Sequence, residues 1–274
     1  MNGKGRSLGS RMKGYEQVYN YKFIPRCPLI ARIDGRSFSK LTKALKFDKP
    51  YDVTFSSWIN KTAIAIAKEV QGSVIGYTQS DEISILIRTD LAPDGSTWFD
   101  NRLQKMCSVI GSIAAANFNK FLMQARGIES PIASFDTRVF QVPDLNEALN
   151  NFIWRQQDCI RNSVIGTCYY ELIKAGQGRK TSQKMMHGLN QEKMKALLKE
   201  KTNLSWEDMA EEFKYGVVII RELKNIETEH GEAIRSAWNP LVAPKFDSQE
   251  GKEWFWQIAN AKRKRDGQEK KEEV

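Results

Sequence analysis

The first half of the chain alternates strand-like and helix-like patterns in an order that few folds accommodate. An apolar run, a stretch of helical spacing, two β-rich runs, a second helical stretch and an alternating run follow one another at residues 28–34, 56–70, 73–77, 82–88, 99–123 and 131–142. This order predicts an α+β fold with the ferredoxin-like β-α-β-β-α-β arrangement and an antiparallel sheet. In that arrangement the end of the first strand and the tip of the hairpin meet at one edge of the sheet.

The chain beyond residue 144 follows a different, mainly helical pattern. Helical spacing covers residues 145–175 and 190–201, and Ser205 with Asp208 has the spacing of a capping box. The run 217–221 predicts one further strand, and residues 254–264 predict a last amphipathic helix. We therefore expect three regions: the sheet region at 1–144, a helical region with one further strand packed on it at 145–260, and a disordered tail at 261–274.

The composition excludes several classes of protein. With 41% apolar residues in 274, the chain can bury a substantial core, yet its longest uncharged stretch is well short of the roughly 20 residues of a membrane helix. The N-terminus has no apolar signal core, so we expect a cytoplasmic protein without membrane contact. Four widely spaced cysteines and two histidines argue against a disulfide framework, a zinc site or a histidine-based triad. Any chemistry then rests on carboxylates, lysines, arginines and a bound metal.

Three carboxylates are expected to converge at the sheet edge. Asp34 ends the first strand, and Asp81 and Glu82 lie at the tip of the hairpin that the fold places beside it. Carboxylates at a few ångströms repel one another unless cations neutralise them, and oxygen-only clusters suit Mg²⁺. The ordinary alternative is a solvated acidic turn. Next to Asp34, the turn of Gly35, Arg36, Ser37 and Phe38 enters a helix and offers backbone N–H groups to phosphate oxygens, although many strand-to-helix turns use such residues.

Cationic side chains recur around this region, and the net charge of +9 suits a polyanionic partner or a solubilising surface. Arg102 and Lys105 share a helix face, and Arg138 lies on the last strand, where they would suit polyphosphate. Each has an alternative as solvated charge, and Asp136 competes for Arg138 as a salt-bridge partner. On the following helix Arg155, Asp158 and Asn162 share one face, which either lines a nucleotide pocket or pairs internally against the sheet.

Six blocks of sequence, in this order, resemble the tRNA-histidine guanylyltransferase family. They are RIDGRSFSKLT at 32–42, FDKPYD at 47–52, YTQSDEIS at 77–84, SFDTRVFQVPD at 134–144, WRQQDCIRNS at 154–163 and FKYGVVIIRE at 213–222. The resemblance implies that 1–144 is a catalytic palm like that of polymerases and cyclases. It also implies a homotetramer with two Mg²⁺ ions that uses ATP, GTP and other nucleoside triphosphates to extend the 5′ end of tRNA in the 3′-to-5′ direction.

The same resemblance implies roles for individual residues. Asp34 and Asp81 would hold the two Mg²⁺ ions, with a backbone carbonyl from Gly35 and support from Glu82. Arg32 and Lys49 match basic residues near the site. The incoming nucleotide would contact Ser80 and the turn 35–38, and the triphosphate of the activating nucleotide would contact Arg102, Lys105 and Arg138.

One segment departs from the eukaryotic members of the family. After WRQQDC they continue with His-Ile-Asn-Asn-Leu-Tyr-Asn, whereas this chain has IRNSVIG at 160–166. This difference resembles the Thg1-like branch, whose members prefer template-directed repair of 5′-truncated tRNA. We therefore expect template-directed addition through a 5′-adenylylated or guanylylated intermediate. The alternatives are non-templated guanylyl addition to tRNA-histidine, a nucleotidyl cyclase or conventional polymerase, and a tRNA-binding module without catalysis.

Overall fold

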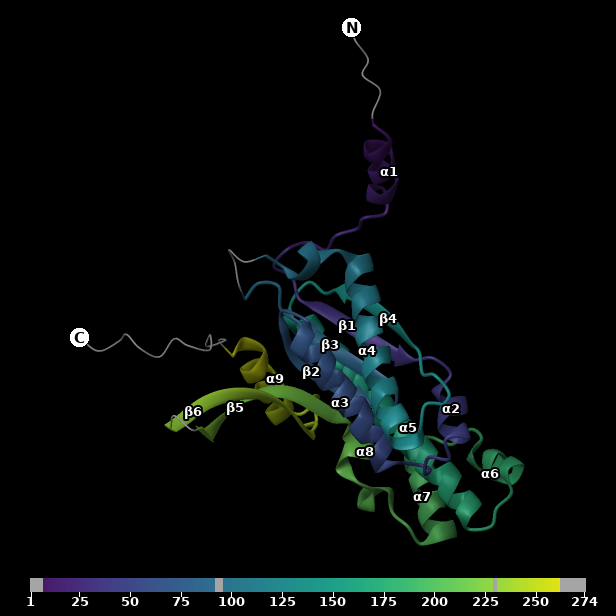
Figure 1. Cartoon of the computed structure of the whole chain (residues 1–274). Coiled ribbons are helices and arrows are strands. Elements are labelled where there is room, and N and C mark those ends of the chain that lie inside the picture. The colour runs from purple at the N-terminus through teal and green to yellow at the C-terminus, as the bar shows by residue number, and fades with distance from the viewer. Residues whose placement is uncertain (1–6, 92–95, 229–230, 262–274) are drawn as a thin grey trace, which may run out of the picture.

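A single six-stranded antiparallel sheet organises the computed structural model, which describes residues 7–91, 96–228 and 231–261. Its strand order is β4-β1-β3-β2-β5-β6 (Figure 1). The strands are β1 (Leu29–Gly35), β2 (Ser73–Gln79), β3 (Glu82–Ile87), β4 (Phe135–Gln141), β5 (Val217–Thr228) and β6 (Gly231–Val242). The order strand, helix, hairpin, helix, strand that the sequence predicts for the first half is therefore present.

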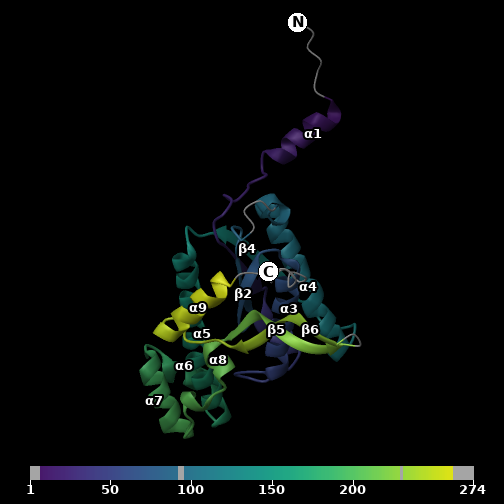
Figure 2. The same cartoon turned by 90° about the vertical axis from the view of Figure 1, so that its left-hand side faces the viewer.

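Helices cover both faces of the sheet. On one face α3 (Val53–Glu69) and α4 (Leu103–Arg126) pack against the side chains of Leu29, Ala31 and Ile33. On the other face α5 (Leu145–Lys174) and α9 (Gln249–Asn260) pack against Ile30, as Figure 2 shows from the side. The near-continuous apolar run of β1 thus follows from burial on both faces, because successive side chains of a strand point to opposite sides.

Two of the long helices that flank the sheet, α3 and α5, each start at an aspartate. The side chain of Asp52 accepts a hydrogen bond from the backbone N–H of Phe55 at the start of α3. Asp144 does the same for Glu147 at the start of α5. These N-caps satisfy backbone donors that a helix leaves free, and so they fix where the two helices begin.

A smaller helical lobe continues from the second half of α5. It contains α6 (Arg179–Met186), α7 (Gln191–Thr202), a short 3-10 turn (Trp206–Asp208) and α8 (Glu211–Tyr215). Its own apolar core includes Cys168, Leu172, Leu198 and Trp206. Since α8 leads directly into β5, this lobe connects back to the central sheet.

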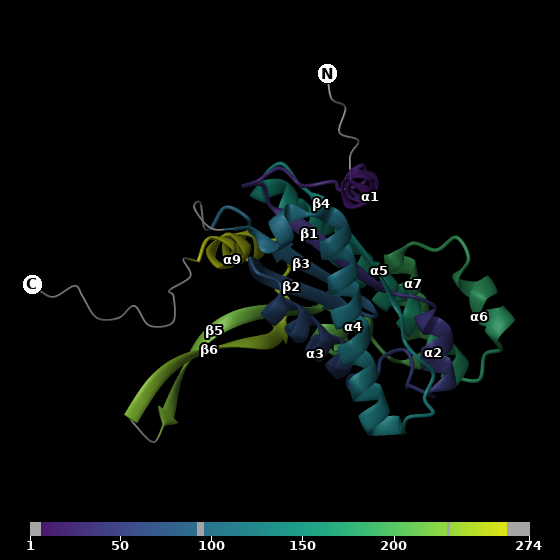
Figure 3. The same cartoon turned by 45° about the horizontal axis from the view of Figure 1, so that its top comes forward.

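Two segments extend away from the body. The helix α1 (Leu8–Gln17) has no buried residue and projects from the top of the molecule (Figures 1 and 3). The β5–β6 hairpin pairs along its whole length, but only residues 217–220 of β5 also pair with β2. The short helix α2 (Phe38–Ala44) follows β1 at the opposite end of that strand from α1. No helix among the described residues is both long enough and apolar enough to cross a membrane.

Three details of the expected C-terminal half are wrong. It has two further strands rather than one, because β6 contains a polar, proline-bearing sequence that becomes a strand only by pairing with β5. Ser205 caps no helix; its hydroxyl donates to Glu207 Oε2, and a 3-10 turn follows. The last helix begins at Gln249 and ends at Asn260, five residues earlier at its start than the apolar spacing predicts. Residues 262–274 of the expected tail lie outside the described residues.

Candidate active site

The end of β1 and the tip of the β2–β3 hairpin meet as the sequence predicts. Ser80 and Asp81 form the two-residue turn between Gln79 and Glu82, which pair with each other. The backbone N–H of Gly35 donates to the carbonyl oxygen of Asp81 at 3.1 Å, so the strand end and the turn are directly joined. The carboxylates of Asp34 and Asp81 therefore share one edge of the sheet.

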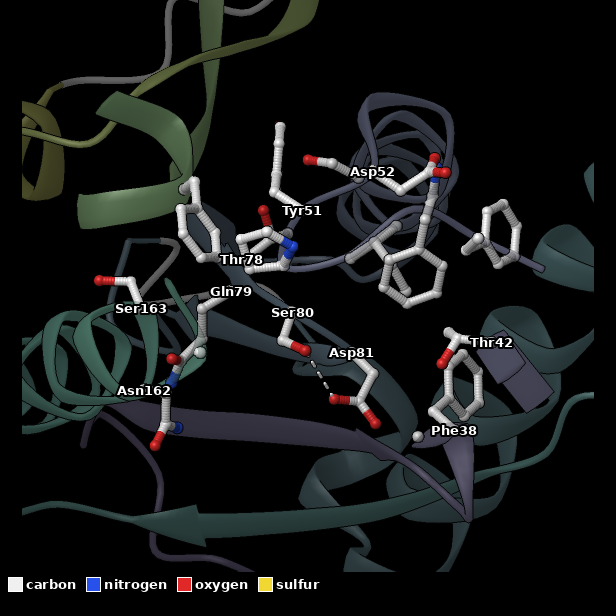
Figure 4. Close-up of a pocket in the computed structure, with 18 of the residues that line it drawn as sticks. Phe38, Thr42, Tyr51, Asp52, Thr78, Gln79, Ser80, Asp81, Asn162 and Ser163 are labelled. Atoms are coloured by element: carbon white, nitrogen blue, oxygen red, sulfur yellow. Dashed lines mark hydrogen bonds between the residues drawn. The ribbon is translucent and has the colours of Figure 1, made fainter. Parts of the chain in front are cut away.

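The environment of Asp81 is unfavourable for its charge. Burial raises the pKa of its carboxyl group from 3.8 to about 6, and the charges of Asp34 and Glu82 add to this effect. Hydrogen bonds act in the opposite direction, among them one from the Ser80 hydroxyl at 3.2 Å (Figure 4). A carboxylate pair under such repulsion is suited to a cation that neutralises it.

Glu82 differs from the other two carboxylates because it already has cationic partners. It lies opposite Asp34 in the strand register and is buried. Arg155 Nε donates to its Oε1 at 2.7 Å, and Arg32 Nε lies 3.6 Å from its Oε2. The structure thus leaves two carboxylates, not three, unneutralised at the sheet edge, and Glu82 belongs to an ion-pair network that connects β3 to α5.

A cavity of about 470 Å³ opens beside Asp34 and Asp81. Figure 4 shows Asn162 and Ser163 of α5 on one side of the Ser80–Asp81 turn and Thr42 on the other. The remaining wall comes from the loop 47–52, which leads into α3. Elements from four distant parts of the sequence therefore enclose a space large enough for a nucleotide.

Lys49 is the cation that faces this cavity. Its Nζ donates to Thr42 Oγ1 at 3.1 Å. Burial lowers the pKa of Lys49, whereas the negative charges of Asp81 and Asp52 raise it. The ammonium group is therefore placed where it can compensate the charge of Asp81 or of a bound phosphate.

Several lining residues were not singled out by sequence reasoning. Tyr51 donates to Glu212 Oε1 at 3.0 Å, and its ring centre lies 5.3 Å from that of Phe213. The pKa of Tyr51 is raised to about 12, and burial of the side chain is the main cause. These contacts tie the loop 47–52 to α8, so that the helical lobe closes one side of the cavity. The one signal in the sequence was the family-like block FDKPYD, which contains Tyr51.

The turn after β1 offers fewer free N–H groups than expected. The N–H of Gly35 binds Asp81, and that of Arg36 donates to the carbonyl oxygen of Ser134 at 2.9 Å. Ser37 adopts a left-handed conformation and begins the seven-residue α2. Phe38 is a core residue, with its ring packed on Phe118 and Phe135. Only the backbone around Ser37 and Phe38 is left to contact a ligand in the cavity.

The three cations expected around a triphosphate come from two elements, the start of α4 and β4. Arg102 and Lys105 lie at the start of α4, where Arg102 forms a β-bridge with Lys22. Lys105 is exposed and lies 5.7 Å from the ring centre of Phe99. Arg138 lies on β4 and pairs with Asp136 at 3.3 Å, so the salt bridge weighed as its alternative is present. None of the three lines the cavity beside Asp34.

The polar face of α5 is divided between two roles. Arg155 binds Glu82 and also donates to Asp158 Oδ2 at 2.6 Å, and Asp158 in addition accepts from Arg161. Internal pairing is therefore the arrangement of Arg155 and Asp158. Asn162, one turn further on, is exposed and lines the cavity, so it alone of the face is placed to contact a nucleotide there.

The residues at the sheet edge fit a Mg²⁺ site completed by substrate. No group of three His, Cys, Asp or Glu side chains close enough to hold a metal occurs in the described part of the chain. Mg²⁺ in nucleotide enzymes commonly takes one or two carboxylates and completes its octahedron with water and phosphate oxygens. Asp34, Asp81 and the carbonyl of Gly35 could supply such a partial set, and the repulsion at Asp81 is what a bound cation would relieve.

A carboxylate pair at the edge of an antiparallel sheet, beside a nucleotide-sized cavity with a lysine, is the kind of site that a nucleotidyltransferase uses. Residues 9–143 match the model of a family described as tRNAHis guanylyltransferase, and residues 147–274 match that of the Thg1 C terminal domain. The chain belongs to the tRNAHis guanylyltransferase family.

Its relatives include proteins of a virus, a fungus and a plant. The chain is 30% identical over 253 residues to an uncharacterized protein of Acanthamoeba polyphaga mimivirus, covering 84% of this chain and 82% of the viral one. A tRNA(His) guanylyltransferase of Debaryomyces hansenii is 28% identical over 224 residues, covering 78% and 81%. For tRNA(His) guanylyltransferase 1 of Arabidopsis thaliana the identity is 26% over 226 residues, and the match covers 80% of this chain and 39% of the plant protein.

Solved structures show the same fold. A bacterial Thg1-like protein in complex with ATP superposes with a TM-score of 0.77 and 32% sequence identity, covering 93% of this chain and all of the bacterial one. A second structure, in complex with GTP, gives a TM-score of 0.71. The tRNA(His) guanylyltransferase of Saccharomyces cerevisiae, at 23% identity and a TM-score of 0.66, shares the fold over 81% of this chain.

Proposed function

We propose that this protein adds nucleotides to the 5′ end of tRNA in the 3′-to-5′ direction, directed by the opposite strand of the acceptor stem. The observation that carries the proposal is the pair Asp34 and Asp81 at the mouth of the cavity, in a chain of this family. The related bacterial Thg1-like structures bind ATP and GTP, and we transfer both nucleotides to this cavity as substrates.

The proposed reaction has two steps. In the first, an oxygen of the RNA 5′-monophosphate attacks the α-phosphorus of ATP or GTP and pyrophosphate leaves. In the second, the 3′-hydroxyl of the incoming nucleoside triphosphate attacks the RNA 5′-phosphorus and AMP or GMP leaves. Two Mg²⁺ ions, when bound, would supply the charge that stabilises the attacking and leaving oxygens.

The chain's own residues bind and orient the reactants. Asp34, Asp81 and the Gly35 carbonyl are the ligands we assign to the metal site, and Glu82 is held by Arg155 and so fixes the strand next to them. Lys49, which lines the same cavity, compensates phosphate charge. The site thus works by positioning and electrostatics, as enzymes of phosphoryl transfer do.

The strand order supports a palm of the polymerase and cyclase type. β4, β1, β3 and β2 are neighbours in that order, with α3 and α4 on one face, which is the arrangement expected of a ferredoxin-like palm. In such a fold one carboxylate lies at the end of the first strand and the other at the neighbouring hairpin turn. Asp34 and Asp81 lie in these places here. A nucleotidyl cyclase or conventional polymerase would share this palm, so the reaction itself must separate the candidates.

The segment 160–166 supports the template-directed branch. Asn162, Ser163 and Gly166 line the cavity. The Ser163 hydroxyl is occupied, because it accepts from Trp206 Nε1 at 3.0 Å and donates to the carbonyl of Ile160. The amide nitrogen of Asn162 donates to Asp158 Oδ2 at 3.3 Å, so beyond the Asn162 amide oxygen this wall offers little with which to select guanine. Base pairing with the opposite RNA strand is left to supply the selection.

The test is the incorporation of labelled nucleoside triphosphates into a 5′-monophosphorylated tRNA transcript that lacks its first nucleotide. Extension by the base that complements the opposite strand supports the proposal. Guanosine addition whatever the template assigns the protein to non-templated guanylyl transfer. A cyclic product assigns it to the nucleotidyl cyclases, and extension of a 3′ end assigns it to the conventional polymerases. Binding of tRNA without incorporation would show that it is a tRNA-binding module without catalysis. Assembly as a homotetramer stays a prediction from the resemblance, and a cytoplasmic location stays a prediction from the sequence.

A further inference from the structure

An exposed tryptophan stands beside the candidate site but outside the cavity. Trp154, on α5, is 52% exposed, although tryptophan is usually highly buried. The guanidinium carbon of Arg155 lies 4.3 Å from the centre of a Trp154 ring, and that of Arg32 lies 5.9 Å from it. A half-exposed indole in contact with guanidinium groups offers a flat surface on which another aromatic ring can stack.

Two arginines on neighbouring strands border this indole. Arg32 of β1 lies opposite Arg138 of β4 in the register, so both side chains point to the face of the sheet that carries α5. Arg32 Nε is buried and lies 3.6 Å from Glu82 Oε2, an ion pair without a hydrogen bond, and the terminal nitrogens of Arg32 donate to no other described residue. Arg138 is exposed, and its pair with the exposed Asp136 is of the kind that contributes little. Both guanidinium groups therefore keep donors for an anion.

The place of this surface limits what can bind to it. Arg32 precedes Asp34 by two residues on one strand, so it lies on the same face at about 7 Å along the strand. The cavity lies on the other side of Asp34, toward β2. β4 is an edge strand, and the surface is therefore open toward the edge of the sheet. A ligand that approaches Asp34 from this side can extend into solvent, as a nucleic acid does and a free nucleotide in the cavity does not.

We propose that Trp154, Arg32 and Arg138, here called the Trp154 platform, bind the 5′ end of the RNA substrate. The terminal base stacks on the indole, and the two arginines contact the adjoining phosphates, so that the 5′-phosphate reaches Asp34. This inference rests on the proposed function, because it assigns the second substrate of the same site. Loss of one stacking aromatic typically weakens single-strand binding by roughly 5- to 100-fold.

The experiment uses a 5′-truncated tRNA transcript with 2-aminopurine as its 5′-terminal base. Stacking on the indole quenches the fluorescence of this base, so binding and stacking are read without catalysis. We expect Trp154→Ala to remove the quenching and to raise the Kd for RNA at least fivefold, while Trp154→Phe keeps most of both. Tyr15→Ala, at a residue 68% exposed on α1, is the matched control and should change neither quantity.

Arg138→Gln tests the phosphate contact. It should lower the slope of log Kd against log salt concentration by about one, as the loss of one phosphate contact does. If Arg138→Gln instead raises the KM for ATP during activation and leaves the RNA Kd and its salt slope unchanged, Arg138 binds the activating nucleotide. That result would overturn its part in the platform.

Two results for Trp154→Ala would overturn the proposal. Unchanged quenching and an RNA Kd within twofold of the wild type would show that no base stacks there. A fall in kcat with RNA Kd and quenching unchanged would mean that Trp154 only holds Arg155 against Glu82. Failure of the proposed function is distinguishable, since wild-type protein that quenches the probe but incorporates no nucleotide would keep the platform and lose the reaction.

Discussion

Asp34 and Asp81 are the two residues on which activity is expected to depend most. We expect Asp34→Asn and Asp81→Asn each to lower nucleotide incorporation at least about 100-fold, because each removes a ligand that positions charge at the reacting phosphate. Thermal unfolding should show that both variants stay folded, since neither side chain belongs to the apolar core. The assay is the incorporation of labelled nucleotide at saturating Mg²⁺.

Asp136→Asn is the matched control for these variants. Asp136 lies opposite Asp34 in the register of β4 and β1, is exposed, and pairs only with the exposed Arg138 among its described neighbours. Its loss should change incorporation less than about twofold, as expected for a surface ion pair. Near-normal activity in Asp34→Asn or Asp81→Asn would remove the metal-ligand assignment.

The raised pKa of Asp81 also predicts how the free energy of unfolding varies with pH in the absence of metal. Its pKa is raised to about 6 by burial and by neighbouring carboxylates, whereas the ordinary value is 3.8. Between these values the folded protein keeps a proton that the unfolded chain has released, so the free energy of unfolding falls as pH rises from about 4 to 6. The loss amounts to at most ~3 kcal/mol, at about 1.4 kcal/mol per pH unit.

Urea unfolding in EDTA at several pH values measures this effect. Asp81→Asn carries no charge and should match the wild type near pH 4, then become the more stable protein as pH approaches 7. A stability difference that stays constant across this range would show that Asp81 titrates in the folded state as it does in the unfolded chain.

At the scale of elements, α5 is joined to the sheet by a buried ion pair. Arg155, 7% exposed in its side chain, binds Glu82 of β3, and its backbone carbonyl accepts from Gln79 Nε2 at 3.1 Å. The helix therefore contacts both residues that flank the Ser80–Asp81 turn. Removing one partner of a buried pair leaves an unpaired charge, which commonly costs about 3–5 kcal/mol.

We expect Arg155→Leu to destabilise the protein by roughly that amount, measured by urea denaturation, and the double variant Arg155→Leu, Glu82→Leu to recover much of it. Arg161→Ala is the control on the same helix, because Arg161 also pairs with Asp158 but is 57% exposed. Its cost should stay below about 1 kcal/mol. A double variant as unstable as Arg155→Leu would show that packing, rather than the unpaired charge, explains the loss.

At the scale of the whole molecule, the cavity wall predicts how the incoming base is chosen. In the wall at 160–166 the Ser163 hydroxyl is hydrogen-bonded to Trp206 and the Asn162 amide nitrogen donates to Asp158, so discrimination should come from pairing with the RNA strand opposite the gap. Four truncated transcripts that differ only at this template base should each incorporate the complementary nucleotide. A mismatched base misplaces the 3′-hydroxyl, and small misplacements can cost about 100-fold in rate.

The control for this prediction keeps the template pair and changes the protein. Asn162→Ala should lower the rate with all four transcripts without changing which base is preferred. Preference for GTP whatever the template base would contradict template-directed addition. A change of the preferred nucleotide in Asn162→Ala would show that the protein, rather than base pairing, selects the incoming base.

The order of the elements and the meeting of Asp34 with Asp81 could be predicted from the sequence. Both depend on local patterns: the apolar run of β1, the spacing in α3 and α4, and a two-residue turn that closes the hairpin. A β-α-β-β-α-β order allows few arrangements of the sheet, so a strand end and a hairpin tip are brought together without knowledge of any other contact.

The tertiary structure decided what surrounds those two carboxylates. Glu82 is neutralised by Arg155, which lies 73 residues away, and Tyr51 is linked to Glu212 over 161 residues. Likewise, β6 is a strand because β5 pairs with it, and Arg102 does not line the cavity but forms a β-bridge with Lys22. Periodicity records which face of an element is buried, but the partner of a buried charge is fixed only by long-range packing, where an unpaired charge is too costly to keep.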